Sequence, residues 1–446
     1  MKSHQGSVCV NLSQEDMKDE VSVDLLKALR EGVKPALGCT EPVALGLAVA
    51  EAYRHIDGNL ERIDIELSPN VYKNGMGVGI PGTTEKGLVF AAALAIACGD
   101  ATLGLEVYRN VSEFDVAKAR EIIETNDINI DVNANEGTLY IKATVKTDKS
   151  EGVCVIRDNH TNIVLVQADD KVILNKESTE DKVSKSSGNG LSDITVKDIV
   201  DFVECVPFED VEFLLEGVKM NMEIARKGLE DASGVGLGAT LNSLMEDGVM
   251  GRDMVSQARM LTSAACDARM SGVNMPVMSS AGSGNNGITA IIPIAVACEQ
   301  LDCGDEKLAK ALAFSHLLTA HIKSFIGVLA PICSCAIAAG IGASASITWL
   351  MGGTQKQIEG SITNIIGTLS GMICDGAKGG CAFKLSTAAS EAIVQAKLAM
   401  SDVFIEQFDG ILGSNADISI RNLAKICMNG MKDMDNQIIE VMTSHS

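Results

Sequence analysis

The chain has 446 residues, more than one ordinary hydrophobic core organises, so we expect two structural units. Its net charge is −22 and no basic stretch interrupts the acidity, which argues against nucleic acid and anionic membranes as partners. The 13 cysteines form no regular framework and the start resembles no secretion signal, so we expect reduced thiols and a cytoplasmic protein.

The first predicted elements are helices within residues 19 to 57, interrupted at Gly38-Cys39-Thr40-Glu41-Pro42. Thr40 is the expected cap of the second helix, which leaves Cys39 close to a helix N-terminus. Because the helix dipole would stabilise a thiolate there, Cys39 is a candidate catalytic base or transient metal ligand. The alternative is an inert buried cysteine beside a cap.

Residues 61 to 180 are predicted to form a small α+β unit. Short alternating apolar runs in this range predict strands, and helices are expected over 84–98 and 114–125. A polar, glycine-rich loop is expected from Tyr72 to Thr83, and its Asn74 is a candidate substrate-binding residue at a helix entrance that suits an anion.

Two further features belong to the end of this unit. His160 lies between two predicted strands and is a candidate to reach a ligand, with a hydrogen-bonded structural histidine as the alternative. Residues 176 to 190 are polar and are expected to form a linker.

Apolar helices punctuated by glycines are predicted across residues 190 to 446. The helices of residues 1 to 60 are expected to pack on this domain, so that the smaller unit is an insertion. The predicted fold class is therefore α+β, a mostly helical catalytic domain with a smaller inserted α+β domain. Its broad helical surface is compatible with a homodimer.

Two uncharged windows, 275–298 and 325–350, are long enough to span a bilayer. They are rich in Ser, Asn and Gly and have no flanking cationic cluster or aromatic belt, so we interpret them as buried segments that line a water-excluded site. Lys323 is the last charge before the second window. We expect it to cap that window at the surface, with pairing to a substrate carboxylate as the alternative.

The loop Ser279 to Gly287 is a candidate carboxylate-binding loop. Glycines expose backbone N–H groups, and Ser and Asn side chains add neutral donors that can hold an anion without a buried cation. A structural turn between two helices is the alternative. The candidate substrate-binding side chains here are Ser279, Ser280, Ser283, Asn285 and Asn286.

Cysteines near the C-terminus are the candidate metal ligands: Cys333, Cys374 and Cys381, with Cys335 as a rival to Cys333. Zinc sites bring ligands in closely spaced pairs, which this spacing does not match. Three thiolates from separated segments suit an iron–sulfur cluster that leaves one iron open to substrate.

The motifs containing Cys39, Asn74, the Ser279 loop, Cys333-Ser334-Cys335 and the pair Cys374 and Cys381 follow one another in this order. With them the chain resembles the L-cysteine desulfidase family, which is related to the α-domain of bacterial iron–sulfur L-serine dehydratases. The chain departs from those dehydratases, which have one cysteine at the first ligand position and a wider spacing between the last two.

This resemblance implies a 4Fe–4S cluster and a lyase that eliminates the β-substituent of a small amino acid. L-cysteine, converted to pyruvate, ammonia and sulfide, is the expected substrate. Two alternatives stay open: an L-serine dehydratase that forms pyruvate and ammonia, and a non-catalytic iron–sulfur redox sensor. The polar loops around an uncharged core favour an enzyme over a sensor, which needs an exposed reactive thiol.

Overall fold

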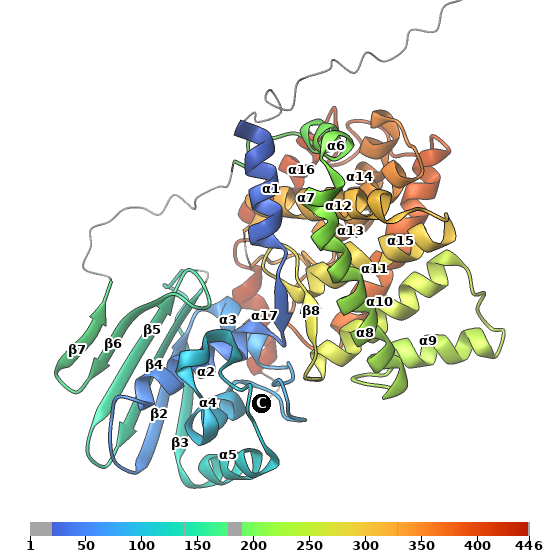
Figure 1. Cartoon of the computed structure of the whole chain (residues 1–446). Helices are drawn as coiled ribbons and strands as arrows, with labels where there is room; N and C mark the ends of the chain where they lie inside the picture. Colours follow the sequence, from blue (N-terminus) through green and yellow to red (C-terminus); the bar gives the residue numbers. More distant parts are fainter. Residues whose placement is uncertain (1–19, 138, 177–189, 328, 445–446) are drawn as a thin grey trace, which may run out of the picture.

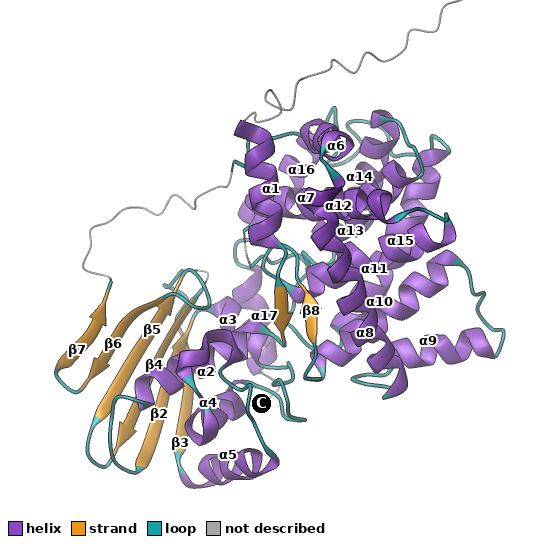
Figure 2. Cartoon of the chain, in the orientation of Figure 1, coloured by secondary structure: helices purple, strands orange, loops and turns teal. Residues whose placement is uncertain are grey.

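The computed structural model of this protein describes residues 20–137, 139–176, 190–327 and 329–444. The chain forms a sheet-containing unit and a larger helical unit that lie side by side (Figure 1). Figure 2 shows most strands gathered in the smaller unit, with a short strand pair at the boundary between the units. The expected α+β, mostly helical fold is confirmed.

The smaller unit is built on a six-stranded sheet of order β3-β2-β4-β5-β6-β7. The β2–β3 pair is parallel and the other pairs are antiparallel. The strands are β2 (Leu60–Leu67), β3 (Asp127–Val132), β4 (Tyr140–Thr147), β5 (Glu151–Arg157), β6 (Ile163–Ala168) and β7 (Lys171–Asn175). The helical segments are α2 (Thr40–Tyr53), α3 (Pro69–Gly75), α4 (Leu88–Cys98), the 3₁₀ segment η2 (Ala101–Glu106) and α5 (Glu113–Thr125).

Alternating side chains of the sheet form the core of this unit. Ile63 and Ile65 of β2 are at most 1% exposed, because residues two apart on a strand share one face. They pack in one cluster with α2, α4 and α5, which cover that face (Figures 1 and 2). The predicted linker over 176 to 190 lies mostly outside the described residues.

The larger unit contains the helices from α6 to η4, together with α1 (Glu20–Gly32). Its first half contains α6 (Val196–Cys205), α7 (Phe208–Val211), η3 (Glu212–Leu214), α8 (Leu215–Glu230), α9 (Leu237–Glu246), α10 (Met254–Met270) and α11 (Gly284–Gln300). Its second half contains α12 (Asp305–Ile326), α13 (Ala338–Leu350), α14 (Gln355–Leu369), α15 (Cys381–Met400), α16 (Ala416–Lys425) and the π-helical η4 (Ile426–Gly430). The last helix, α17 (Met434–Thr443), packs against α3 of the smaller unit.

The uncharged windows fold into central helices of the larger unit. α13 packs against α11, α12, α14 and α15, so all its sides face other helices and its side chains are nearly all buried. Burial on every side accounts for the absence of charge in its sequence. In the part of the chain that the structure describes, no helix combines the length and apolarity needed to cross a membrane.

The expected packing of residues 1–60 on the helical domain is wrong for α2. α1 contributes Leu25 and Leu29 to the core of the larger unit and contacts α12. α2 instead contributes Val43 and Leu47 to the core of the smaller unit, where it lies against β4 and β5. Because α2 is apolar on nearly all sides, its sequence pattern did not indicate which core it joins.

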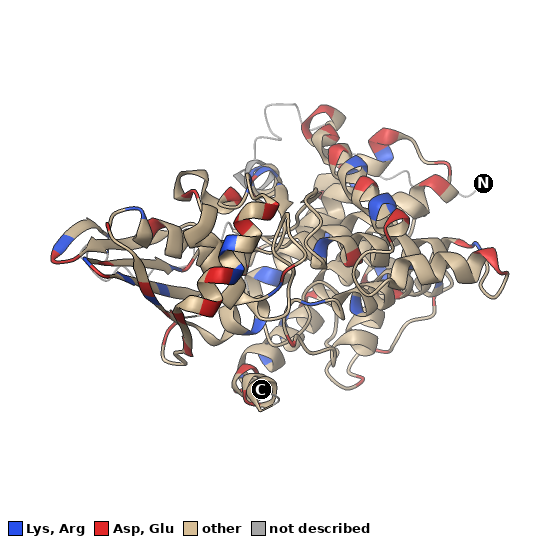
Figure 3. Ribbon diagram, turned by 90° about the horizontal axis from the view of Figure 1, so that it is seen from below, with Lys and Arg blue, Asp and Glu red and all other residues tan. Residues whose placement is uncertain are grey.

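A two-stranded antiparallel ladder joins the two units. β1 (Pro35–Leu37) pairs with β8 (Pro276–Met278), each only three residues long. Such short strands show no alternation, which is why the sequence pattern indicated no strand after Asp193. Figure 3, in which the ribbon is coloured by residue type, shows Lys and Arg positions and Asp and Glu positions on both units.

Candidate active site

The β1–β8 ladder brings the turn before α2 next to the loop before α11. Ser279 follows β8 directly, and its backbone N–H and its Oγ both donate to the carbonyl of Lys34, at 2.9 and 2.6 Å. The N–H of Ala281 donates to the carbonyl of Gly32 at 3.0 Å. The turn that contains Cys39 and the Ser279 loop are therefore held side by side by backbone hydrogen bonds.

Backbone pairing also joins the two C-terminal cysteine segments. Cys333 N–H donates to the carbonyl of Met372 at 2.8 Å, and Cys374 N–H donates to the carbonyl of Pro331 at 2.7 Å. Gly376, at φ +95°, lies against the backbone of Lys73 and continues the chain toward α15, which begins at Cys381. Segments far apart in sequence thus present their cysteines in one place.

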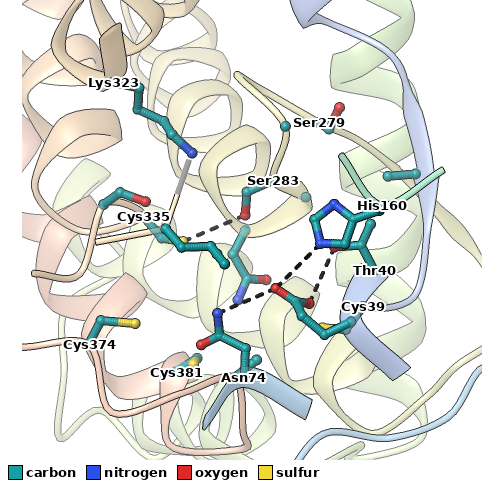
Figure 4. A pocket seen from close by; sticks show the side chains of 18 of the residues that line it. Cys39, Thr40, Asn74, His160, Ser279, Ser283, Lys323, Cys335, Cys374 and Cys381 are labelled. Atoms are coloured by element: carbon teal, nitrogen blue, oxygen red, sulfur yellow. Dashed lines mark hydrogen bonds and ion pairs between the residues drawn. The ribbon is translucent and has the colours of Figure 1, made fainter. Parts of the chain in front are cut away.

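These segments enclose a cavity of about 480 Å³ at the boundary between the units. Figure 4 shows Cys39, Cys335, Cys374 and Cys381 around it, with Lys323 and Ser283 above them. The predicted site residues that line the cavity are Cys39, Asn74, Ser279, Ser283, Asn285, Cys333, Cys335, Cys374 and Cys381. The structure therefore brings most of the candidates together.

The thiols of the cavity differ in acidity. Burial raises the pKa of Cys381 to about 11 and also raises that of Cys374. In contrast, the pKa of Cys335 is lowered to about 6, chiefly because the Cys333 thiol donates a hydrogen bond to its sulfur. Ser283, Lys323 and Arg269 contribute to this lowering. Cys335 is therefore the most readily ionised thiol of the cavity.

Cys39 itself, rather than Thr40, occupies the N-cap position of α2, with extended backbone at φ −92° and ψ 137°. Thr40 is the first helical residue, and its hydroxyl donates to a carboxylate oxygen of Glu41 at 3.3 Å. Burial raises the pKa of Cys39 to about 12, although Arg269 acts in the opposite direction. The helix-dipole argument for a thiolate is therefore outweighed by desolvation as long as the thiol has no ligand.

Two residues of the Ser279 loop do not line the cavity. The side chain of Ser280 is fully buried and bonds to Nδ1 of His316 at 2.8 Å. Asn286 is also fully buried, donates to the Ser280 carbonyl at 3.3 Å and accepts a hydrogen bond from Ser334 at 3.3 Å. Both side chains point away from the cavity and bond to groups on the other side of the loop, because consecutive residues of a tight turn point in different directions.

His316 completes this support as a neutral imidazole. It is buried inside α12, and burial lowers its pKa to about 3. Its Nε2 is a buried atom with no hydrogen-bond partner among the described residues.

The smaller unit contributes a second polar group to the cavity wall. Asn74 lies in α3 rather than in the expected loop, since Pro69 at the first helical position starts a helix there. The Asn74 amide donates to Glu41 Oε1 at 3.4 Å, and His160 Nε2 lies 3.9 Å from the same oxygen. Burial lowers the pKa of His160, opposed by the Glu41 carboxylate.

Lys323 does not cap the uncharged window 325–350 at the surface as expected. It lies in the last turn of α12, lines the cavity and is 7% exposed. Burial lowers its pKa. α12 ends at Ile326 inside the molecule, so its last turn points toward the site rather than toward solvent (Figure 4).

Sequence reasoning did not find Arg269, which lines the cavity at 5% exposure in the last turn of α10. Its Nη1 donates to Asn285 Oδ1 at 3.0 Å and its Nη2 donates to the carbonyl of Gly38 at 2.6 Å. The available signal was a pair of charged residues, Asp267 and Arg269, within the otherwise small and apolar stretch 263–270. A glycine-rich loop thus does meet a buried cation, contrary to expectation.

The similarity of this chain to known proteins extends across both of its units. A sequence profile described as "Serine dehydratase alpha chain" matches residues 102–440. The chain is 44% identical to a UPF0597 protein of Caldanaerobacter subterraneus subsp. tengcongensis over 95% of this chain and 98% of the relative. UPF0597 proteins of Clostridioides difficile (strain 630) and Clostridium tetani are 44% and 42% identical, over 94% of this chain and 98% and 97% of the relatives.

Proposed function

Because the chain belongs to the serine dehydratase alpha chain family, we propose that it is an iron–sulfur-dependent lyase that acts on L-cysteine. The reaction consumes one water and gives pyruvate, ammonia and hydrogen sulfide. The observation that supports it most is the group of thiols around one cavity, contributed by three separate chain segments (Figure 4).

The donor set fits a polynuclear cluster better than a single ion. Within the described residues, no group of three or more His, Cys, Asp or Glu could hold a single metal ion. Thiols spread around a cavity wall suit a cluster, which has several irons to ligate. An iron–sulfur cluster with an open iron would supply Lewis-acid chemistry that makes a thiol or hydroxyl a better leaving group.

We assign the ligands as Cys335, Cys374 and Cys381. Cys335 is preferred over Cys333 because its thiol ionises more readily and because the Cys333 thiol donates to its sulfur. Cys39 is assigned as the ligand that closes the resting cluster. With a pKa raised to about 12 it would be a neutral thiol when unligated, which makes it a poor base.

Lys323 is the proposed base that removes the α-proton. Its burial lowers its pKa, and a lower pKa increases the share of neutral amine that can accept a proton. The Ser279 loop is the proposed carboxylate-binding element, through Ser283 and Asn285 on the cavity wall. Asn74 orients Glu41, which is available to the substrate ammonium group.

The test is turnover by anaerobically reconstituted protein. We expect L-cysteine to give pyruvate and sulfide in equal amounts, and Lys323→Met to lower kcat by about 10²–10⁴-fold with unchanged iron content. An intact cluster without pyruvate from any β-substituted amino acid would reject the lyase and favour the redox sensor. Full turnover by Lys323→Met would reject the base assignment alone.

L-serine is a second candidate substrate, favoured by the family description. The same assay compares the two amino acids, since both reactions release pyruvate. A higher kcat/KM for L-serine than for L-cysteine would make the protein an L-serine dehydratase with the same ligands and base.

A further inference from the structure

Arg269 is a buried cation whose hydrogen-bond partners are all neutral. Its two printed bonds go to the Asn285 side chain and to the Gly38 carbonyl, and its buried Nε has no partner among the described residues. Among the described residues, no carboxylate forms an ion pair with the Arg269 guanidinium. A buried charge that lacks a counter-charge is unfavourable, so an anion beside it would be stabilised.

The cavity has room and charge for such an anion. The charged side chains on its wall are four cations and two anions, with His160 counted apart: Lys34, Arg269, Lys323 and Lys384 against Glu31 and Glu41. Glu41 already accepts hydrogen bonds from Thr40 and Asn74. A buried guanidinium on the wall of an enclosed cavity favours a negatively charged ligand beside it.

The loop is shaped around this guanidinium. A Cβ on Gly284 would lie 2.5 Å from Arg269 Nε and 2.8 Å from its Cζ, so glycine is required for the guanidinium to lie against the loop backbone. Asn285, the next residue, lines the cavity and accepts from Nη1. Arg269 thus lies between the loop and the turn that carries Cys39.

We propose that Arg269 binds the carboxylate of the substrate and makes the site selective for α-amino acids over their neutral derivatives. This inference rests on the proposed function, because it places the substrate in this cavity. A guanidinium offers donors in a planar fork that matches a carboxylate, and such charge-assisted bonds are stronger than neutral ones. Asn285 fixes the guanidinium in place, because its Oδ1 accepts from Nη1 while its amide nitrogen donates to Met270 Sδ at 3.6 Å.

The test compares L-alanine with L-alaninamide, which differ at the carboxylate and lack a leaving group at the β-carbon. Binding to the reconstituted protein is measured by calorimetry. We expect wild type to bind L-alanine at least about tenfold more tightly, and Arg269→Gln to lose about 10–100-fold for L-alanine and less than twofold for the amide. Arg269→Lys, which retains the charge without the fork, is expected to lie between them.

Arg259→Gln is the matched control, since Arg259 lies on the same helix and donates to Ser386 outside the cavity wall. It should bind L-alanine as wild type does. Equal wild-type affinity for the two ligands would overturn the proposal without any variant. An equal loss of affinity for both ligands in Arg269→Gln would indicate a structural role for Arg269. Loss of iron in this variant would indicate that Arg269 faces the cluster. Either result overturns the proposal.

The two proposals fail separately. L-alanine binding does not require elimination, so carboxylate selectivity is measurable even if neither L-cysteine nor L-serine is turned over. Pyruvate formation with unchanged L-alanine affinity in Arg269→Gln would remove the inference and leave the proposed function intact.

Discussion

Individual side chains of the cavity differ more in acidity than their shared burial would indicate. Burial alone raises the pKa of a thiol, as it does for Cys374 and Cys381. Cys335 is an exception because two hydrogen-bond donors and two cations surround its sulfur. The neighbouring Cys333 donates one of these bonds, and its own pKa is raised by the same bond and by burial.

The Cys333–Cys335 pair leads to a prediction for the metal-free protein. Because the pKa of Cys335 is lowered to about 6, its thiolate should be present above pH 6 and lost as the pH falls through that value. Alkylation of Cys335 by iodoacetamide, followed by mass spectrometry across pH 5 to pH 9, should show a midpoint near 6. In Cys333→Ser the midpoint should move upward. The serine hydroxyl lies at a different distance from the Cys335 sulfur than the cysteine thiol, so the hydrogen bond that lowers the Cys335 pKa is weakened.

Cys374→Ser is the control for this experiment, because Cys374 does not donate to the Cys335 sulfur. Its Cys335 midpoint should stay close to that of wild type. A wild-type midpoint near the ordinary thiol value of 9.0 would contradict the assignment of Cys335 as the ionised member of the pair.

At the scale of elements, close helix packing positions Arg269. α8 and α10 approach so closely at Gly228 that a Cβ there would lie 2.1 Å from the backbone oxygen of Ala264. Ala264 is five residues before Arg269 on α10. The glycine therefore sets the distance between two helices, one of which carries the buried cation of the site.

Gly228→Ala should destabilise the protein by about 1–3 kcal/mol, because backbone atoms cannot yield as a flexible side chain can. The measurement is the thermal unfolding midpoint. Gly340→Ala in α13 is the matched control, since its Cβ would meet Ala388 at an ordinary 3.6 Å. There alanine should be neutral or slightly stabilising, and an equal effect of both substitutions would contradict the packing argument.

At the scale of the whole molecule, the C-terminal helix links the two units. α17 follows the helices of the larger unit and packs against α3 of the smaller one (Figure 1). Its Asp435 forms an ion pair with Lys73, which is 1% exposed. Lys73 precedes Asn74 and contacts the backbone at Gly376, so this pair lies beneath the cavity wall.

Asp435→Ala should lower the free energy of unfolding by about 3 kcal/mol, because it leaves the Lys73 ammonium buried without its counter-charge. Urea denaturation measures the change. Glu440→Gln on the exposed side of the same helix is the control and should change stability by less than about 0.5 kcal/mol. Equal stability of Asp435→Ala and wild type would show that α17 does not hold the units together through this pair.

Sequence reasoning reached most strands of the six-stranded sheet, the buried uncharged helices and most of the candidate residues that line the cavity. Alternation identified β2 and β4, and the absence of charge identified α13, because both patterns report directly on which faces are buried. Cysteines and glycine-rich turns marked the site, since few other roles require those residues together. The order of these motifs along the chain also led to the correct family.

The tertiary structure decided which side chains face the cavity and which charges are buried. Ser280 and Asn286 share a motif with Ser283 but point to the opposite side, where His316 lies. Arg269 lies in a stretch of small residues in the sequence, but that pattern does not show whether its guanidinium faces a cavity or solvent. The sequence by itself indicated the cysteines and the glycine-rich loop that line the cavity, because these follow from local patterns. The geometry and electrostatics of the site depended on contacts between distant segments, such as β1 with β8, that local patterns do not encode.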